Sequence, residues 1–178
     1  MRYLTIILFL LLIIPGIAKP AEPADIEPVS NEISQIEWFI MRWTEVRRNS
    51  PVRKIADQVA KWVVKAVDGL PVTPWELLFV CCKETSLIPR PGIVGEIGPG
   101  QLHGAALKYA RKMVGVSRDA LRGQSEASYR GVAEWLAFCK RKCPEYPYGF
   151  YHTGRCQDHH YNRDVRRMLM TIDRVLSE

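Results

Sequence analysis

The segment TPWELLFVCCKETS, residues 73–86, constrains the fold of this 178-residue chain more than any other. Thr73 can cap a helix, Pro74 fits its first turn, and Glu76 stands where the acid of a capping box belongs. Seven of the eight residues 75–82 are apolar, so a helix that begins here is apolar on nearly every side. A helix of this kind needs protein around it. The sequence therefore predicts a buried central helix that other elements surround.

Helical periodicity continues through the rest of the chain. Apolar residues recur at three- and four-residue steps in five further segments, as in helices with one apolar face. No segment shows the alternation of apolar and polar residues that predicts a half-buried strand. A chain of this length is expected to form one domain with a single core. We expect an all-α fold whose other helices lie at about 31–49, 52–67, 100–113, 125–141 and 162–176.

The first thirty residues are expected to lie outside this domain. Arg2, the apolar run YLTIILFLLLII and the small residues at 16–18 have the layout of an export signal, residues 1–18. A retained membrane anchor is the alternative, but Pro15 ends the apolar run before the roughly 20 residues that span a bilayer. Residues 19–30, KPAEPADIEPVS, contain three prolines and few large apolar groups, which predicts a flexible linker. The helical domain then occupies residues 31–178.

The charge of the chain bears on its partners. The net charge is +6 at pH 7, and it becomes +5 once Arg2 leaves with the signal. An exported basic protein meets anionic envelope polymers and lipid headgroups rather than nucleic acid, although a surface rich in Lys and Arg needs no partner. We expect a periplasmic or secreted protein that needs no cofactor and has no membrane span after cleavage of the signal. An envelope-assembly partner is a further expectation.

The five cysteines have two interpretations. An oxidising compartment permits disulfides, and the odd number leaves at least one thiol outside them. Cys81 and Cys82 are adjacent and point to different sides of a helix, so at most one of them is expected to join a bridge. The alternative is a structural zinc site, because four later residues have suitable ligand types and spacing: Cys139, Cys143, Cys156 and His159. The compartment favours disulfides, and we expect no metal.

Glu84 is the strongest candidate for chemistry. It follows Leu77 by seven residues and Cys81 by three, so it shares their buried stripe where the helix leaves the core. Partial burial and the negative end of the helix dipole both disfavour an ionised carboxyl group at such a place. A carboxylic acid that stays protonated is what general acid catalysis requires. The alternative is a glutamate that simply reaches solvent at the helix end.

A loop rich in turn-forming residues follows Glu84 and leads to Gln101 at the start of the next predicted helix. Its backbone must turn sharply at several glycines and prolines, namely Pro89, Pro91, Gly92, Gly95, Gly98, Pro99 and Gly100. A tight loop beside a protonated acid can form one wall of a cleft. Its backbone donors and acceptors could then bind a sugar.

These features resemble the lytic transglycosylases with the soluble lytic transglycosylase (SLT) domain, within the lysozyme-like superfamily. That family has a catalytic Glu followed by Ser at a helix end, then a loop, then a Gly-Leu-Met-Gln segment that opens the next helix. Glu84-Thr85 and Gly98-Pro99-Gly100-Gln101 are similar to these elements, with an interval of seventeen residues from Glu to Gln. The segment FYHTG, residues 150–154, matches the family's Ala-Tyr-Asn-x-Gly element more loosely. The likeness spans roughly residues 52–176 and rests on order and spacing.

Several positions depart from the family pattern. Thr85 replaces Ser, Pro99 and Gly100 replace Leu and Met, and His152 replaces Asn. A tyrosine that the family often has before its last helix would fall at about Asp164, with Tyr161 one turn away. These departures bear on the substrate contacts more than on the acid.

The resemblance implies a lysozyme-like helical domain that cleaves the β-1,4 bond between N-acetylmuramic acid and N-acetylglucosamine in peptidoglycan. Glu84 would protonate the leaving oxygen and then, as a carboxylate, take the proton from the muramic acid C6 hydroxyl, which closes a 1,6-anhydro ring. One carboxylate would serve both steps. Ordinary glycoside hydrolysis uses two carboxyl groups.

Glu96 keeps a hydrolytic alternative open. It stands where animal-type lysozymes and some secretion-associated muramidases have an Asp just before a glycine. A muramidase could use Glu84 and Glu96 together, whereas a solvated loop acid would have no part in the reaction. The altered motif residues also fit a catalytically inactive, peptidoglycan-binding envelope protein. The cysteine and histidine set fits a zinc-stabilised interaction domain.

The resemblance also implies three residues that contact or support the substrate. Thr85 follows the acid, Gln101 would hold the sugar's amide or brace the cleft, and Tyr151 would support Glu84 from across the cleft. The alternatives are a glutamine in water at a helix start and an aromatic residue of the core. The four histidines form no triad with a Ser or Cys nucleophile, so we expect solvated or packing roles for His103, His152, His159 and His160.

Overall fold

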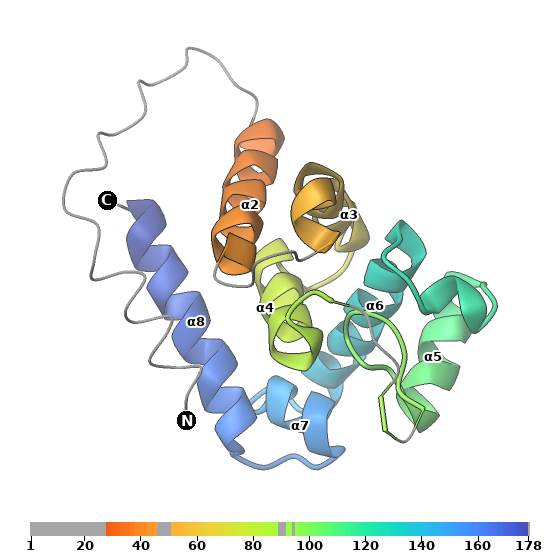
Figure 1. The fold of residues 1–178 in the computed structure, drawn as a ribbon. Helices are drawn as coiled ribbons and strands as arrows, with labels where there is room; N and C mark the ends of the chain where they lie inside the picture. The colour runs from red at the N-terminus through yellow and green to blue at the C-terminus, as the bar shows by residue number, and fades with distance from the viewer. Residues whose placement is uncertain (1–27, 46–50, 89–91, 94, 178) are drawn as a thin grey trace, which may run out of the picture.

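Helix α4, Pro74–Thr85, lies at the centre of the fold (Figure 1). The side chain of Thr73 accepts a hydrogen bond from the Glu76 backbone N–H at 3.2 Å, and Glu76 Oε2 accepts one from the Thr73 N–H at 2.7 Å. This reciprocal pair is the predicted capping box. Nine residues of the helix are buried. The predicted buried central helix is therefore confirmed.

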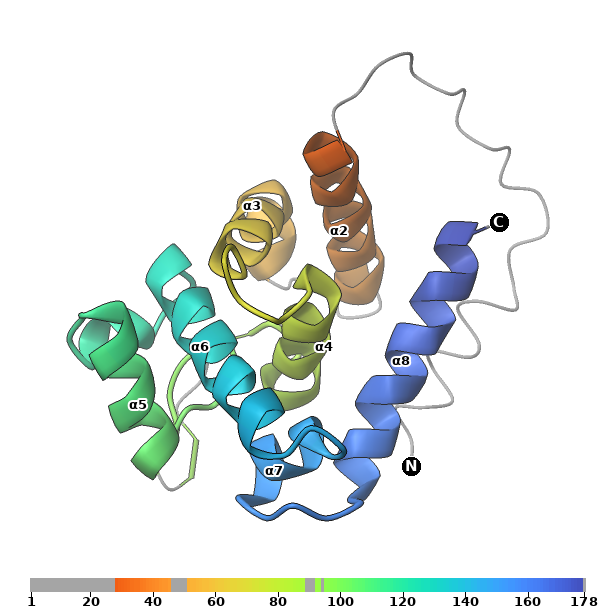
Figure 2. The same ribbon diagram turned by 180° about the vertical axis from the view of Figure 1, so that it is seen from behind.

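The computed structural model describes residues 28–45, 51–88, 92–93 and 95–177. The other helices surround α4 and confirm the all-α prediction (Figure 1). Viewed from behind, α6 runs between α4 and α5 (Figure 2). The elements are α2 (Pro28–Glu45), η1 (Pro51–Ile55), α3 (Ala56–Ala66), α5 (Gly104–Val114), η2 (Asp119–Leu121), α6 (Glu126–Lys142), α7 (Pro147–Thr153) and α8 (His160–Ser177).

Two predicted boundaries at the N-terminal side need correction. Helix α2 begins at Pro28, so the last three residues of the predicted linker belong to the domain. Proline fits the first turn of a helix because it has no N–H to leave unpaired there. The chain from residue 52 starts as the 3-10 turn η1 before α3 begins at Ala56. The predicted export signal and most of the predicted linker fall outside the described residues.

The predicted helix at 100–113 begins later than expected. Residues 97–102 form a tight reverse turn in which Ile97 and Leu102 exchange backbone hydrogen bonds of 3.1 and 2.9 Å. Gly98 and Gln101 have left-handed backbones in this turn, with φ of 73° and 49°. Helix α5 therefore starts at Gly104. Leu102 in the turn and Ala110 in the helix are buried.

A short helix, α7, was not predicted. It follows α6 and precedes α8, and it is the element that carries Tyr151 and His152. A disulfide between Cys143 and Cys156 joins the chain just before α7 to the chain just after it. Cys81, Cys82 and Cys139 are buried and lie outside this disulfide. The prediction of a disulfide is confirmed, and the bridge occupies two of the four side chains of the alternative zinc site.

Among the described residues, none of the helices combines the length and apolarity needed to cross a bilayer.

Candidate active site

An open cavity of about 410 Å³ lies between the end of α4, the turn before α5, and α7. It brings together four of the five predicted site residues, Glu84, Glu96, Gln101 and Tyr151. The remaining lining residues come from the start of α5, from α6 and from α7: Leu102, His103, Gly104, Ala105, Ala106, Trp135, Phe150, His152 and Gly154. Acidic groups, an amide and aromatic rings thus share one hollow of a size that admits a small ligand.

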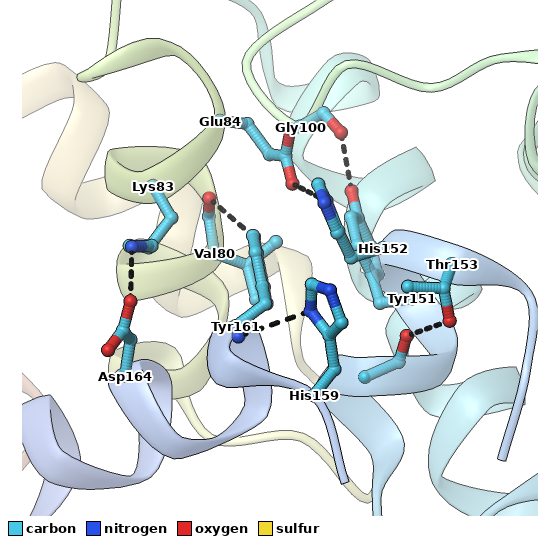
Figure 3. A network of polar contacts seen from close by, with 11 residues as sticks. Val80, Lys83, Glu84, Gly100, Tyr151, His152, Thr153, His159, Tyr161 and Asp164 are labelled. Atoms are coloured by element: carbon cyan, nitrogen blue, oxygen red, sulfur yellow. Dashed lines mark hydrogen bonds and ion pairs between the residues drawn. The ribbon is translucent and has the colours of Figure 1, made fainter. Parts of the chain in front are cut away.

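Glu84 lies in the last turn of α4, which ends at Thr85. Its side chain is 15% exposed, so the carboxyl group is partly desolvated while remaining accessible from the cavity. Its Oε1 lies 3.8 Å from Nδ1 of His152 (Figure 3). The predicted placement of Glu84 at the edge of the core is confirmed. The neighbouring histidine was not predicted as part of the site.

Two tyrosines, Tyr151 and Tyr161, lie next to Glu84. Burial, followed by the negative charge of Glu84, raises the pKa of Tyr151 well above its usual value. The same two causes, together with a hydrogen bond to Glu84, raise the pKa of Tyr161. Both phenols therefore stay neutral. The Tyr161 hydroxyl donates a long hydrogen bond of 3.5 Å to the carbonyl oxygen of Val80 (Figure 3).

Tyr151 also fixes the turn that contains Gly100. Its hydroxyl donates a hydrogen bond of 2.6 Å to the carbonyl oxygen of Gly100 (Figure 3). The α-carbon of Gly100 is so close to α6 and α7 that an added methyl group would lie 2.5 Å from Tyr151 Oη and 2.5 Å from a methyl group of Val132. The glycine thus allows the turn to pack directly on Tyr151 beside the cavity.

Thr85 lies beneath the site. Its side chain is buried, and its hydroxyl is within hydrogen-bonding distance of two backbone carbonyl oxygens, that of Cys81 at 3.2 Å and that of Pro99 at 2.9 Å. It does not line the cavity described above. The structure therefore places Thr85 as a brace between α4 and the turn, whereas the sequence analysis expected it to contact the substrate.

Glu96 immediately precedes the reverse turn, and Gln101 lies within it. Glu96 packs closely on Gly92, where an added methyl group would overlap its carboxyl group, and the Gly92 N–H donates to the Glu96 carbonyl oxygen at 3.0 Å. Gln101 donates from Nε2 to the carbonyl oxygen of Gly98 at 3.2 Å. Both side chains line the cavity with Glu84. The second carboxyl group that a hydrolytic mechanism needs is thus present in the same hollow.

The chain leaves Glu84 through a strained backbone. Ser86 and Leu87 both have left-handed conformations, with φ of 57° and 65°, although neither is glycine. Ser86 is the C-cap of α4, and Leu87 is fully buried in the core. Gln101, across the cavity, is the third non-glycine residue with positive φ in the described chain. Strain of this kind is found most often at functional sites.

His152 and Tyr161 are the two neighbours of Glu84 that the sequence analysis did not place in the site. The rings of His152 and Tyr161 stack with centroids 4.7 Å apart and an angle of 11° between their planes. A signal for both was present, because His152 occupies the Asn position of the family's third element and Tyr161 lies one turn from the expected tyrosine. His152 is exposed and packs on Tyr161, as predicted, and its Nδ1 also lies 3.8 Å from Oε1 of Glu84.

The arrangement has the parts needed for acid–base chemistry on a neutral ligand. One partly buried carboxyl group lies beside two neutral phenols and shares the cavity with an imidazole, an amide and aromatic rings. Within the described ranges, no group of three or more His, Cys, Asp or Glu side chains could hold a metal ion. Searches against protein-family models, curated proteins and solved structures find no match to this chain.

Proposed function

We propose that this protein is an exported peptidoglycan lytic transglycosylase in which Glu84 is the general acid and base. The observation that carries the proposal is the position of Glu84. Its carboxyl group ends a buried helix, is 15% exposed, and opens into the cavity that Glu96, Gln101 and Tyr151 also line. A general acid must lie within reach of the atom it protonates, and the cavity gives Glu84 that access.

The reaction would proceed through two proton transfers. Glu84 gives its proton to the glycosidic oxygen as the bond from that oxygen to C1 of the muramic acid breaks. The C6 hydroxyl oxygen then bonds to C1, and its proton returns to Glu84. The products are a free 4-hydroxyl end and a 1,6-anhydromuramic end, and no water is consumed.

The walls of the cavity fit a sugar chain. Trp135 and Phe150 supply apolar faces, and Gln101 supplies an amide that can pair with an N-acetyl group. The rings of Trp135 and Phe150 lie 6.4 Å apart between centroids, so both can contribute to one continuous apolar wall. Sugar rings bind such surfaces through their C–H faces while their polar groups reach hydrogen-bonding side chains.

A muramidase is the second candidate, and Glu96 is the observation that favours it. Glycoside hydrolases use two carboxyl groups, and Glu96 lines the same cavity as Glu84. In that reaction a water molecule attacks C1 in place of the C6 hydroxyl, so the product has a reducing end.

The products of cell-wall digestion test these candidates. The chain without residues 1–18 is purified and incubated with sacculi, and the released muropeptides are analysed by mass spectrometry. We expect 1,6-anhydromuramic ends. Reducing ends alone would show that the protein is a muramidase rather than a transglycosylase. Binding to sacculi without release of muropeptides would identify a non-catalytic binding protein.

A further inference from the structure

His152 is a titratable side chain of the cavity to which the proposed reaction assigns no role. Its Nδ1 lies 3.8 Å from Oε1 of Glu84. Its side chain is 43% exposed and lines the cavity. An imidazole that contacts the acid and is also open to a ligand can exchange protons with both.

The ring of His152 is held in place by its neighbours. It stacks on Tyr161 at 4.7 Å and lies 5.3 Å from the ring of His159 between centroids. His159 is held in turn, because its Nδ1 accepts a hydrogen bond from the Tyr161 backbone N–H at 3.3 Å (Figure 3). Tyr161 is also near Glu84, whose negative charge is among the causes that raise the pKa of Tyr161. Catalytic groups need this kind of fixed mutual geometry.

We propose that His152 is a second catalytic residue, the base that accepts the C6 hydroxyl proton and relays it to Glu84. The inference rests on the proposed transglycosylase function and divides its two proton transfers between two side chains. A neutral imidazole is a stronger base than a carboxylate. It therefore suits the removal of a proton from a sugar hydroxyl better than Glu84 alone does.

Every proton that moves in the relay has a donor and an acceptor. Glu84 protonates the leaving oxygen, and the bond between that oxygen and C1 breaks. The C6 oxygen then bonds to C1 while its proton passes to Nε2 of His152, and the proton on Nδ1 passes to the Glu84 carboxylate. Both side chains end neutral. Exchange with solvent, to which His152 is exposed, returns the ring proton to Nδ1 before the next turnover.

The relay is tested by removing the imidazole of His152 and supplying free imidazole in solution. The mature chain and its His152→Ala variant are incubated with sacculi, with and without added imidazole, and the initial rate of release of anhydromuropeptides is measured. We expect His152→Ala to release them about 100-fold more slowly, the scale of a lost general base. Free imidazole should restore part of the rate, because it can occupy the vacated space.

Two further variants complete the experiment. His152→Gln fills the space that imidazole would occupy, so we expect a similar loss without rescue. His160→Ala removes an exposed neighbouring imidazole and should leave the rate unchanged with or without added imidazole. Circular dichroism and thermal unfolding show whether each variant folds. If His152→Ala does not fold, His152→Gln carries the test, and a rate equal to that of the unmodified chain overturns the relay.

The remaining outcomes separate this inference from the proposed function. An undiminished rate for folded His152→Ala overturns the relay and leaves the transglycosylase intact. A slow, folded His152→Ala that imidazole does not rescue also overturns the relay, because a purely structural role predicts that result. Failure of the unmodified chain to release any muropeptide overturns the proposed function and the relay together.

Discussion

The Tyr151 hydroxyl donates a hydrogen bond of 2.6 Å to the Gly100 carbonyl oxygen and so joins the short helix α7 to the turn before α5. This contact holds the turn against α7 at the edge of the cavity. It depends on the absence of a side chain at residue 100, where a methyl group would lie 2.5 Å from both Tyr151 Oη and a Val132 methyl group.

Gly100→Ala should therefore destabilise the protein. Tyr151 and Val132 must both move, and overpacking of this kind typically costs about 1–3 kcal/mol. Urea unfolding measures the change in the free energy of unfolding. Gly123→Ala is the matched control, because an added methyl group there meets no atom within 4 Å. Equal stability of the two variants would contradict the packing described for Gly100.

Glu84→Gln should lower the rate of muropeptide release by about 100-fold or more, because the amide can neither donate nor accept the proton. The thermal unfolding temperature should change little, since the substitution keeps the shape of a side chain at the edge of the core. Glu145→Gln is the control, because Glu145 is exposed and lies outside the cavity. Release of muropeptides by Glu84→Gln at the rate of the unmodified chain would show that Glu84 has no part in the reaction.

Glu96→Gln separates the two proposed reactions. In the transglycosylase, Glu96 transfers no proton, so its loss should slow the reaction less than about 10-fold, well below the effect of losing a general acid or base. The released fragments should keep their anhydro ends. Product mass spectra and initial rates check both points. A far larger loss, together with reducing ends in the unmodified protein, would support the muramidase.

Glu76 should make the stability of the fold depend on acidic pH. Its burial opposes ionisation, but hydrogen bonds from Lys140, Tyr148 and the Thr73 backbone, with the charge of Lys140, outweigh burial and lower its pKa from 4.5. A carboxyl group whose pKa is lowered by folding contributes stability that is present above its unfolded pKa. This contribution is lost as the pH falls below 4.5 through the folded pKa.

Urea unfolding of the unmodified chain and of Glu76→Gln at neutral pH and below 4.5 tests this dependence. We expect Glu76→Gln to be less stable at neutral pH by about 1–3 kcal/mol, with the difference shrinking as the pH falls. Glu126→Gln is the control, because its ion pair with Lys65 is exposed and such pairs contribute little. A difference that stays constant down to the lowest pH would contradict the role given to the Glu76 charge.

Local signals in the sequence were sufficient for most of the helices. The capping box and the apolar run located α4 because both act within one turn of the chain. The spacing of Tyr129, Val132 and Leu136 located α6, and that of Val165, Met168 and Ile172 located α8. Helix α7 was missed because its seven residues are too few to show a period and include Gly149.

The site was predictable only in part. Glu84 could be chosen because its neighbours along one helix show where the core ends. The approach of His152 to Glu84 depends on how α7 packs against α6 and α8, which no local pattern reports. Thr85 was expected to face a ligand because it follows the acid, but helical geometry turns its hydroxyl toward the Cys81 and Pro99 carbonyl groups.

The left-handed backbone at Ser86 and Gln101 has a consequence for attempts to make this protein more heat-resistant. A residue with a β-carbon costs about 1–2 kcal/mol in that conformation, which glycine adopts freely. Laboratory selection for thermal tolerance alone should therefore enrich Ser86→Gly. The same change at Gln101 would remove an amide from the cavity, so selection for turnover should reject it.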